Sequence, residues 1–148
     1  MLRFQFHLSH SIDISLFNFK NQTFLLRFAA IIILLAHSIP GMLNNGINNF
    51  GNLYLNPLGF APFGVLIAWI IKLSHVAAAV SLLIEKYMKW ACIGTILILI
   101  QGIIMVHFSE GWFVVGGGRN GMEFNFLLIF VLLTILFPNG ITKGITKD

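Results

Sequence analysis

Residues 107–126 read HFSEGWFVVGGGRNGMEFNF, a polar and glycine-dense segment between two long apolar runs. A plain connection between two helices needs only a few residues, so this segment is expected to do more than join its neighbours. The apolar runs on either side are long enough to lie in a membrane as helices. The segment is therefore predicted to be the loop of a helical hairpin, held at a membrane surface by the rest of the chain.

The composition of the chain is that of an integral membrane protein. Of its 148 residues, 57% are hydrophobic and only 9% are charged, unlike a soluble domain of this length. The nine Lys and Arg are scattered between apolar runs, so they form no patch for nucleic acid. The single cysteine, Cys92, excludes an internal disulfide and a two-cysteine thiol relay, and is interpreted as an apolar packing residue.

Four apolar runs predict four membrane-spanning helices, over residues 22–43, 60–84, 91–108 and 121–137. Short connections between spans of alternating direction make an all-α, up-and-down four-helix membrane bundle. The uncharged stretch 44–59 is rich in Asn and Gly, and is predicted to be a turn-rich loop.

The remaining segments flank this membrane domain, which covers residues 22–138. Residues 1–21 are predicted to be a retained interfacial segment and not a cleaved leader, because the apolar run that follows is one of several. Residues 139–148 form a polar tail. The N-terminus, the tail and the connection at 85–90 contain six of the nine Lys and Arg, whereas the loops at the opposite end contain only Arg119. Both termini are therefore predicted to be cytoplasmic, with the chain in the inner (cytoplasmic) membrane.

The first span contains two ionisable residues, Arg27 and His37. Helical spacing places them on one face with Ala30, Leu34 and Gly41. This face is predicted to point into the protein, because ionisable side chains are costly against lipid. For Arg27 the alternative is that its long side chain extends to the cytoplasmic headgroups.

The second span contains Lys72 near its middle and His75 three residues later, on the same helical face. An ammonium at that depth must find a carboxylate, reach water or lose its proton. Lys72 is therefore predicted to face the bundle interior and to pair with a polar group or line a cavity. The small residues 77–79 follow it and favour close contact with another helix.

The polar segment supplies the remaining candidates, which are predicted to form one cluster at the outer end of the bundle: His107, Trp112, Arg119, Asn120 and Glu123. Arg119 is expected to pair with Glu110 or Glu123. Asn120 and Glu123 also have the spacing of a helix N-cap and an acid at N3, so Glu123 is either a cap or a functional group. The three glycines at 116–118 lack the Lys and Ser or Thr of a phosphate loop.

Two histidines, His37 and His107, lie towards the outer ends of their spans. Paired histidines can hold haem iron or another metal ion, which makes haem a candidate cofactor. Interfacial histidines are more often hydrogen-bonded only, so no metal site is predicted.

The third loop carries a further pattern: GWF at 111–113, GGG at 116–118 and NGxE at 120–123, followed at once by an apolar helix. Together with an Arg in the first span, this pattern resembles the DoxX family of small four-span bacterial membrane proteins over about residues 22–138. The resemblance implies association with quinol or thiosulfate oxidation and with membrane oxidoreductase complexes. Members commonly have a Glu in the second span, ahead of small residues, and here His75 takes that place.

Two functions of different classes remain open. The resemblance implies a subunit of, or partner to, a quinone-linked membrane redox system, with Lys72 and His75 among its polar contacts. The alternative is a non-catalytic membrane scaffold, or a carrier of lipids or small molecules. No sequence feature supplies an activated nucleophile, a dinucleotide fingerprint or a carboxylate pair, so catalysis by this chain alone is not expected and no catalytic residue is assigned. The expected partners are the lipid bilayer, a membrane redox protein and a second copy of the chain.

Overall fold

The computed structural model describes residues 21–116 and 119–140, and this part of the chain is helical without strands. The predicted N-terminal segment and tail lie almost entirely outside the described residues. The helical elements are α1 (Phe24–Leu43), α2 (Gly46–Phe50), η1 (Gly51–Phe60), α3 (Gly64–Leu83), α4 (Met88–Gly102), η2 (Ile103–His107), η3 (Phe108–Glu110) and α5 (Glu123–Leu136). Of these, η1 and η2 are π-helical and η3 is a 3₁₀ turn.

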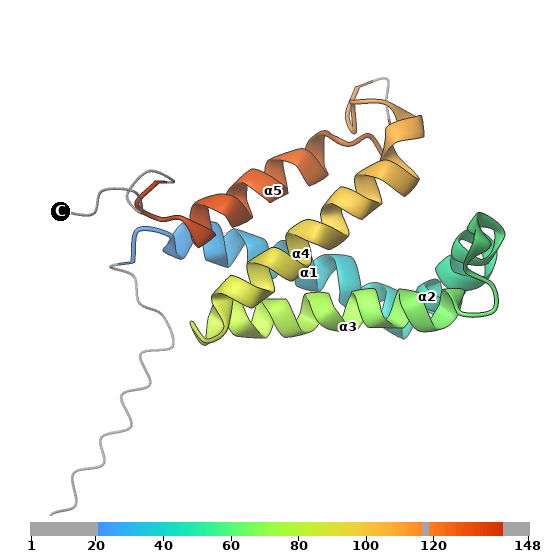
Figure 1. Ribbon diagram of the computed structural model, residues 1–148, viewed down its shortest axis with the longest axis horizontal. Helices are drawn as coiled ribbons and strands as arrows, with labels where there is room; N and C mark the ends of the chain where they lie inside the picture. Colours follow the sequence, from blue (N-terminus) through green and yellow to red (C-terminus); the bar gives the residue numbers. More distant parts are fainter. Residues whose placement is uncertain (1–20, 117–118, 141–148) are drawn as a thin grey trace, which may run out of the picture.

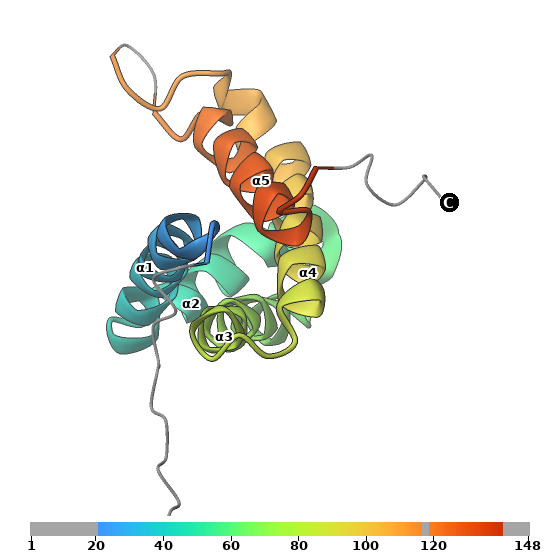
Figure 2. The same ribbon diagram turned by 90° about the vertical axis from the view of Figure 1, so that its left-hand side faces the viewer.

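The long helices form two antiparallel pairs. In Figure 1, α1 and α3 run side by side, and α4 and α5 form a second pair that leans away from the first. The contacts close into a ring, because α3 packs against α4 and α5 packs back against α1. Figure 2 shows this arrangement from the end where α1 begins and α5 finishes. The polar segment lies at the other end of the α4–α5 pair.

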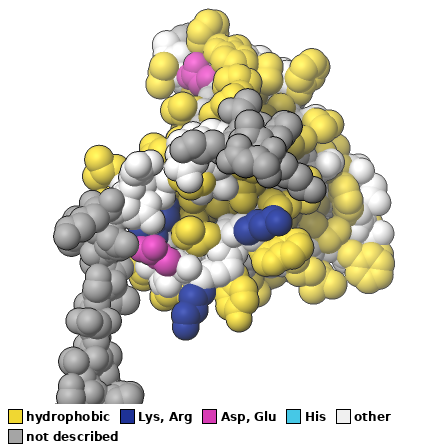
Figure 3. All heavy atoms as spheres, turned by 60° about the vertical axis from the view of Figure 1, so that its left-hand side comes forward, with side chains coloured by type: hydrophobic (Ala, Val, Ile, Leu, Met, Phe, Trp, Pro, Cys, Tyr) yellow, Lys and Arg dark blue, Asp and Glu magenta, His cyan; other side chains and the backbone are white. Residues whose placement is uncertain are grey.

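Three of these helices are long and apolar enough to cross a membrane: α1, α3 and the continuous helix Met88–Glu110. At most 28% of the residues in the most apolar stretch of each helix are buried, so most of its apolar side chains point outwards. Hydrophobic side chains are widespread on the face seen in Figure 3, among polar and charged ones. Apolar surface on this scale is typical of proteins that meet lipid. The described part of the chain is therefore that of a helical membrane protein with three candidate spans, and α5 is a shorter apolar helix of 14 residues.

The core lies between the four long helices, where small residues allow their backbones to approach. Ala30 on α1 and Ala79 on α3 are almost fully buried, as is Cys92 on α4, which has the packing role expected from the sequence. Leu132 on α5 completes the same cluster. A second, smaller cluster around Ile47 joins α2 and η1 to α3.

The predicted turn-rich loop at 44–59 was wrong, because residues 46–60 are helical. Asn45 adopts a left-handed conformation that separates α1 from α2, and α2 begins directly after it. Two of the asparagines that suggested turns bond to α3 instead. Asn48 accepts a hydrogen bond from Trp69 Nε1 at 2.9 Å, and Asn56 accepts one from the backbone N–H of Gly64 at 3.0 Å.

Candidate functional site

Three ionisable residues whose placement in a membrane costs free energy lie close together between α1 and α3. Lys72 lies near the middle of α3, and its Nζ donates a hydrogen bond to the carbonyl oxygen of His37 at 3.1 Å. The rings of His37 and His75 face each other at an angle of 48°, with their centroids 5.9 Å apart. We call these three residues the basic cluster. Lys72 thus has the polar partner that its depth requires, supplied by the backbone of the neighbouring helix.

The deepest member of the basic cluster is His75, which is 2% exposed. Neither of its ring nitrogens has a hydrogen-bond partner within the described residues. Ser38, which follows His37 and is fully buried, has an equally unpartnered hydroxyl. An unsatisfied buried polar group costs about 1–3 kcal/mol, so these atoms are candidates for contact with an ordered water or a bound ligand.

Ser38 was not predicted from the sequence. The buried face of α1 consists of Arg27, Ala30, Leu34 and Ser38, so the prediction was correct for its first three members. It assigned the next position to His37, which is largely exposed. A step of four residues from Leu34 leads to Ser38, and the repeated spacing of four was the signal that the prediction overlooked.

The polar segment folds back onto the start of α5. His107 donates from Nδ1 to the carbonyl oxygen of Asn120 at 2.5 Å, and a carboxylate oxygen of Glu123 accepts a hydrogen bond from the backbone N–H of Val114 at 2.8 Å. Trp112 packs against Phe126 at 5.4 Å between ring centroids. His107, Trp112, Asn120 and Glu123 therefore lie at one end of the molecule, but the hydrogen bonds there join side chains to backbone.

Two expectations for this segment were wrong. Arg119 is exposed, and in the described part of the chain no ion pair joins it to Glu110 or Glu123. Asn120 is not the N-cap of α5, which begins at Glu123 after Met122 and has no side-chain cap. Asn120 has a positive φ of 58°, which turns the chain before the helix starts. Glu123 is therefore neither the N3 residue of a capping box nor half of an ion pair.

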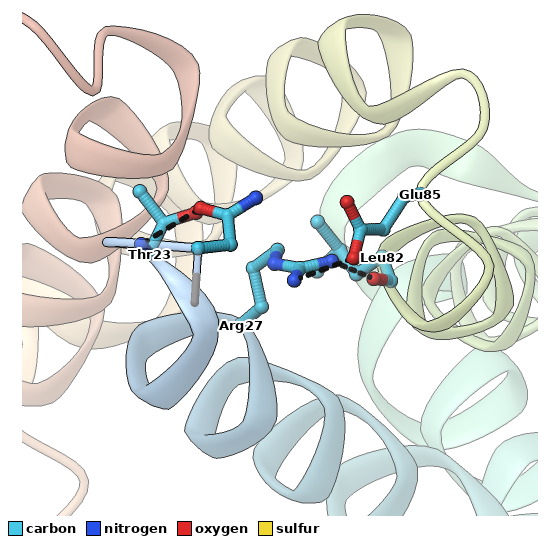
Figure 4. Close-up of polar contacts among 5 residues, drawn as sticks. Thr23, Arg27, Leu82 and Glu85 are labelled. Carbon is cyan, nitrogen blue, oxygen red and sulfur yellow. Dashed lines mark hydrogen bonds and ion pairs between the residues drawn. The ribbon is translucent and has the colours of Figure 1, made fainter. Parts of the chain in front are cut away.

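Arg27 is buried between the start of α1 and the end of α3. Its guanidinium donates to the Leu82 carbonyl oxygen at 3.1 Å and to Glu85 at 2.9 Å, as Figure 4 shows. It thereby joins the start of α1 to the end of α3. Sequence reasoning did not assign Glu85, although the predicted topology placed it on the same side of the membrane as Arg27.

The histidines considered for haem have different neighbours. His37 lies against His75, whereas His107 is bound to the backbone of Asn120. Among residues 21–116 and 119–140, no group of three or more His, Cys, Asp and Glu side chains is placed to hold a metal ion. The structure therefore gives no donor set from which to argue a metal centre.

No family model, curated protein or solved structure matches this chain. The resemblance to the DoxX family therefore stays a prediction, and the function has to be argued from the chemistry of the site.

Proposed function

We propose that this chain is a subunit of, or partner to, a quinone-linked redox system of the cytoplasmic membrane, and that it binds the quinone without catalysing a reaction alone. The proposal includes a DoxX-like bundle of four spans, with α5 as the fourth and both termini in the cytoplasm. The ring of contacts supports four spans, because α5 packs against both α1 and α4 as a helix inside a bundle does.

The observation that carries the proposal is the basic cluster, in which His75 is buried with both ring nitrogens unpartnered. A quinone presents carbonyl oxygens on an apolar ring, so it needs hydrogen-bond donors within apolar surroundings. The Lys72 ammonium and a ring N–H of His75 are donors of this kind. Ligand sites usually combine a mostly apolar lining with a few such polar groups.

Quinone binding by the purified protein tests this proposal. Trp69 lies three residues before Lys72 on α3, so a short-chain quinone bound at the basic cluster is expected to quench tryptophan fluorescence saturably. His75→Leu removes one donor and is expected to weaken binding by about tenfold, the equivalent of one hydrogen bond of ~1.4 kcal/mol.

Thr134→Val is the matched control, because Thr134 is exposed on α5 and bonds only to the Phe130 carbonyl of its own helix. This variant is expected to bind quinone as the wild-type protein does. Quenching that rises linearly with quinone concentration, or that is the same in His75→Leu, contradicts quinone binding at this site.

A further inference from the structure

The basic cluster contains a cation and no carboxylate. Of the acids that the structure describes, Glu85 is paired with Arg27 at one end of the molecule, and Glu110 and Glu123 belong to the polar segment at the other. The ammonium of Lys72 has three donors, and its one hydrogen bond within the described residues goes to a neutral carbonyl. An anion bound there would offset the cost of a charge in the membrane.

The depth of Lys72 limits which anion can reach it. It lies eight residues after Gly64 and eleven before Leu83 on α3, which is about 12 and 16 Å from the two helix ends at ~1.5 Å per residue. The phosphate of a phospholipid lies in the headgroup layer, outside the hydrocarbon core. The carboxyl group of a single acyl chain is small enough to enter that core with its chain.

The basic cluster also has an open side. His37 is exposed, Lys72 is half-buried and His75 is buried, so the three side chains lead from the outer surface of the α1–α3 pair into its interior. About one helical turn away on the same faces lie the apolar side chains of Ile33 on α1 and Val76 on α3, which are partly buried. In a membrane this outer surface faces acyl chains, so a ligand that enters here comes from the lipid and has an apolar body.

We propose that the basic cluster binds the carboxylate of a long-chain lipophilic acid, such as a fatty acid, which enters sideways from the bilayer. Lys72 is its charge partner, and His75 donates the inner hydrogen bond. This inference rests on the proposed function for the location of the ligand site, but it concerns the charge of the ligand and not a redox role.

The test compares a fluorescent polyene fatty acid, cis-parinaric acid, with its methyl ester in neutral buffer, in which a carboxylic acid is ionised and a lysine is protonated. Energy transfer from tryptophan in the detergent-solubilised protein reports binding. The acid is expected to bind at least tenfold more tightly than the ester. Lys72→Met is expected to reduce acid binding to the level of the ester and to leave ester binding unchanged, whereas Lys72→Arg keeps the preference.

Lys89→Met is the control, because Lys89 is an exposed lysine in the first turn of α4 and its loss is expected to change nothing. Equal affinity for acid and ester in the wild-type protein overturns the inference, as does an unchanged preference in Lys72→Met with a native circular dichroism spectrum. Saturable quinone binding without a preference for the acid overturns this inference alone. Binding of neither quinone nor acid overturns the proposed function as well.

Discussion

Arg27 is buried although it is charged, because its guanidinium has two polar partners at the end of the helix beside it. The last carbonyl groups of a helix have no partner within that helix, and Arg27 donates to one of them, that of Leu82. The carboxylate of Glu85 balances the charge at 2.9 Å. Glu85 has a positive φ of 58°, so the turn after α3 is shaped to present this side chain.

The pair predicts a measurable loss of stability when the acid is removed. Glu85→Ala leaves a buried cation without its partner and is expected to lower the free energy of unfolding by about 1–3 kcal/mol, less than for a fully buried pair because Glu85 is partly exposed. Adding Arg27→Met is expected to restore part of the loss. Denaturant unfolding in detergent measures both, and Lys86→Ala, an exposed neighbour, is the control. Equal stability of Glu85→Ala and Lys86→Ala would show that the ion pair contributes nothing.

For individual residues, the sequence showed which side chains need a polar partner. It was less successful in predicting which groups those partners are. The cost of a charge in a membrane follows from residue type, so Arg27, Lys72 and His75 were identified from the sequence alone. Arg27 bonds to the Glu85 carboxylate and the Leu82 carbonyl, and Lys72 bonds to the His37 carbonyl, whereas His75 has no partner among the described residues. Backbone groups have no sequence signature, and for this reason the bonds from Lys72 and His107 could not be predicted.

Among the elements, the α2–η1 segment depends on close contact between two glycines. A Cβ atom added to Gly51 would overlap the backbone of Val65, and one added to Gly64 would overlap the carbonyl oxygen of Gly51. The two backbones therefore touch where η1 crosses the start of α3. The contact pairs residues that are distant along the chain, so the composition of 44–59 gave no indication of it.

Alanine substitutions test this contact directly. Gly51→Ala forces η1 away from α3 and is expected to destabilise the protein by about 1–3 kcal/mol, the usual cost of overpacking. Gly94→Ala on α4 is the matched control, because a Cβ there meets nothing within 4 Å. Since alanine favours helix over glycine, the control is expected to be neutral or slightly stabilising. Thermal unfolding followed by circular dichroism compares the two, and equal melting temperatures would rule out the close contact.

For the whole molecule, the apolar runs predicted the long helices well, since the first span, 22–43, agrees closely with α1. Element boundaries were less accurate where local turns intervene: α3 begins at Gly64 and not at residue 60. The packing of the helices against one another could not be predicted, because apolar residues surround each of them. Only small or polar residues distinguish the inner face of a membrane helix from the outer face.

The orientation in the membrane is a prediction for the whole molecule. In a Cys92→Ala background, Val115→Cys in the polar segment is expected to react with an impermeant maleimide added to intact cells, because basic residues favour placing the opposite end in the cytoplasm. Lys86→Cys in the α3–α4 connection is expected to react only after permeabilisation. Both positions are exposed, so reactivity reports the side of the membrane. The reverse pattern would require the opposite orientation.

The shortness of α5 has a consequence for the bilayer if this helix is the fourth span. Its 14 residues extend about 21 Å, whereas the hydrocarbon core of a bilayer is ~30 Å thick. If α5 crosses the membrane, the lipid beside it must thin, and each ångström of mismatch costs a fraction of a kcal/mol. The protein then favours membranes of short-chain lipids, and two copies that bring their α5 helices together share one thinned region. Bilayer thickness would in this way influence in which membranes the protein concentrates and whether a second copy lies beside it.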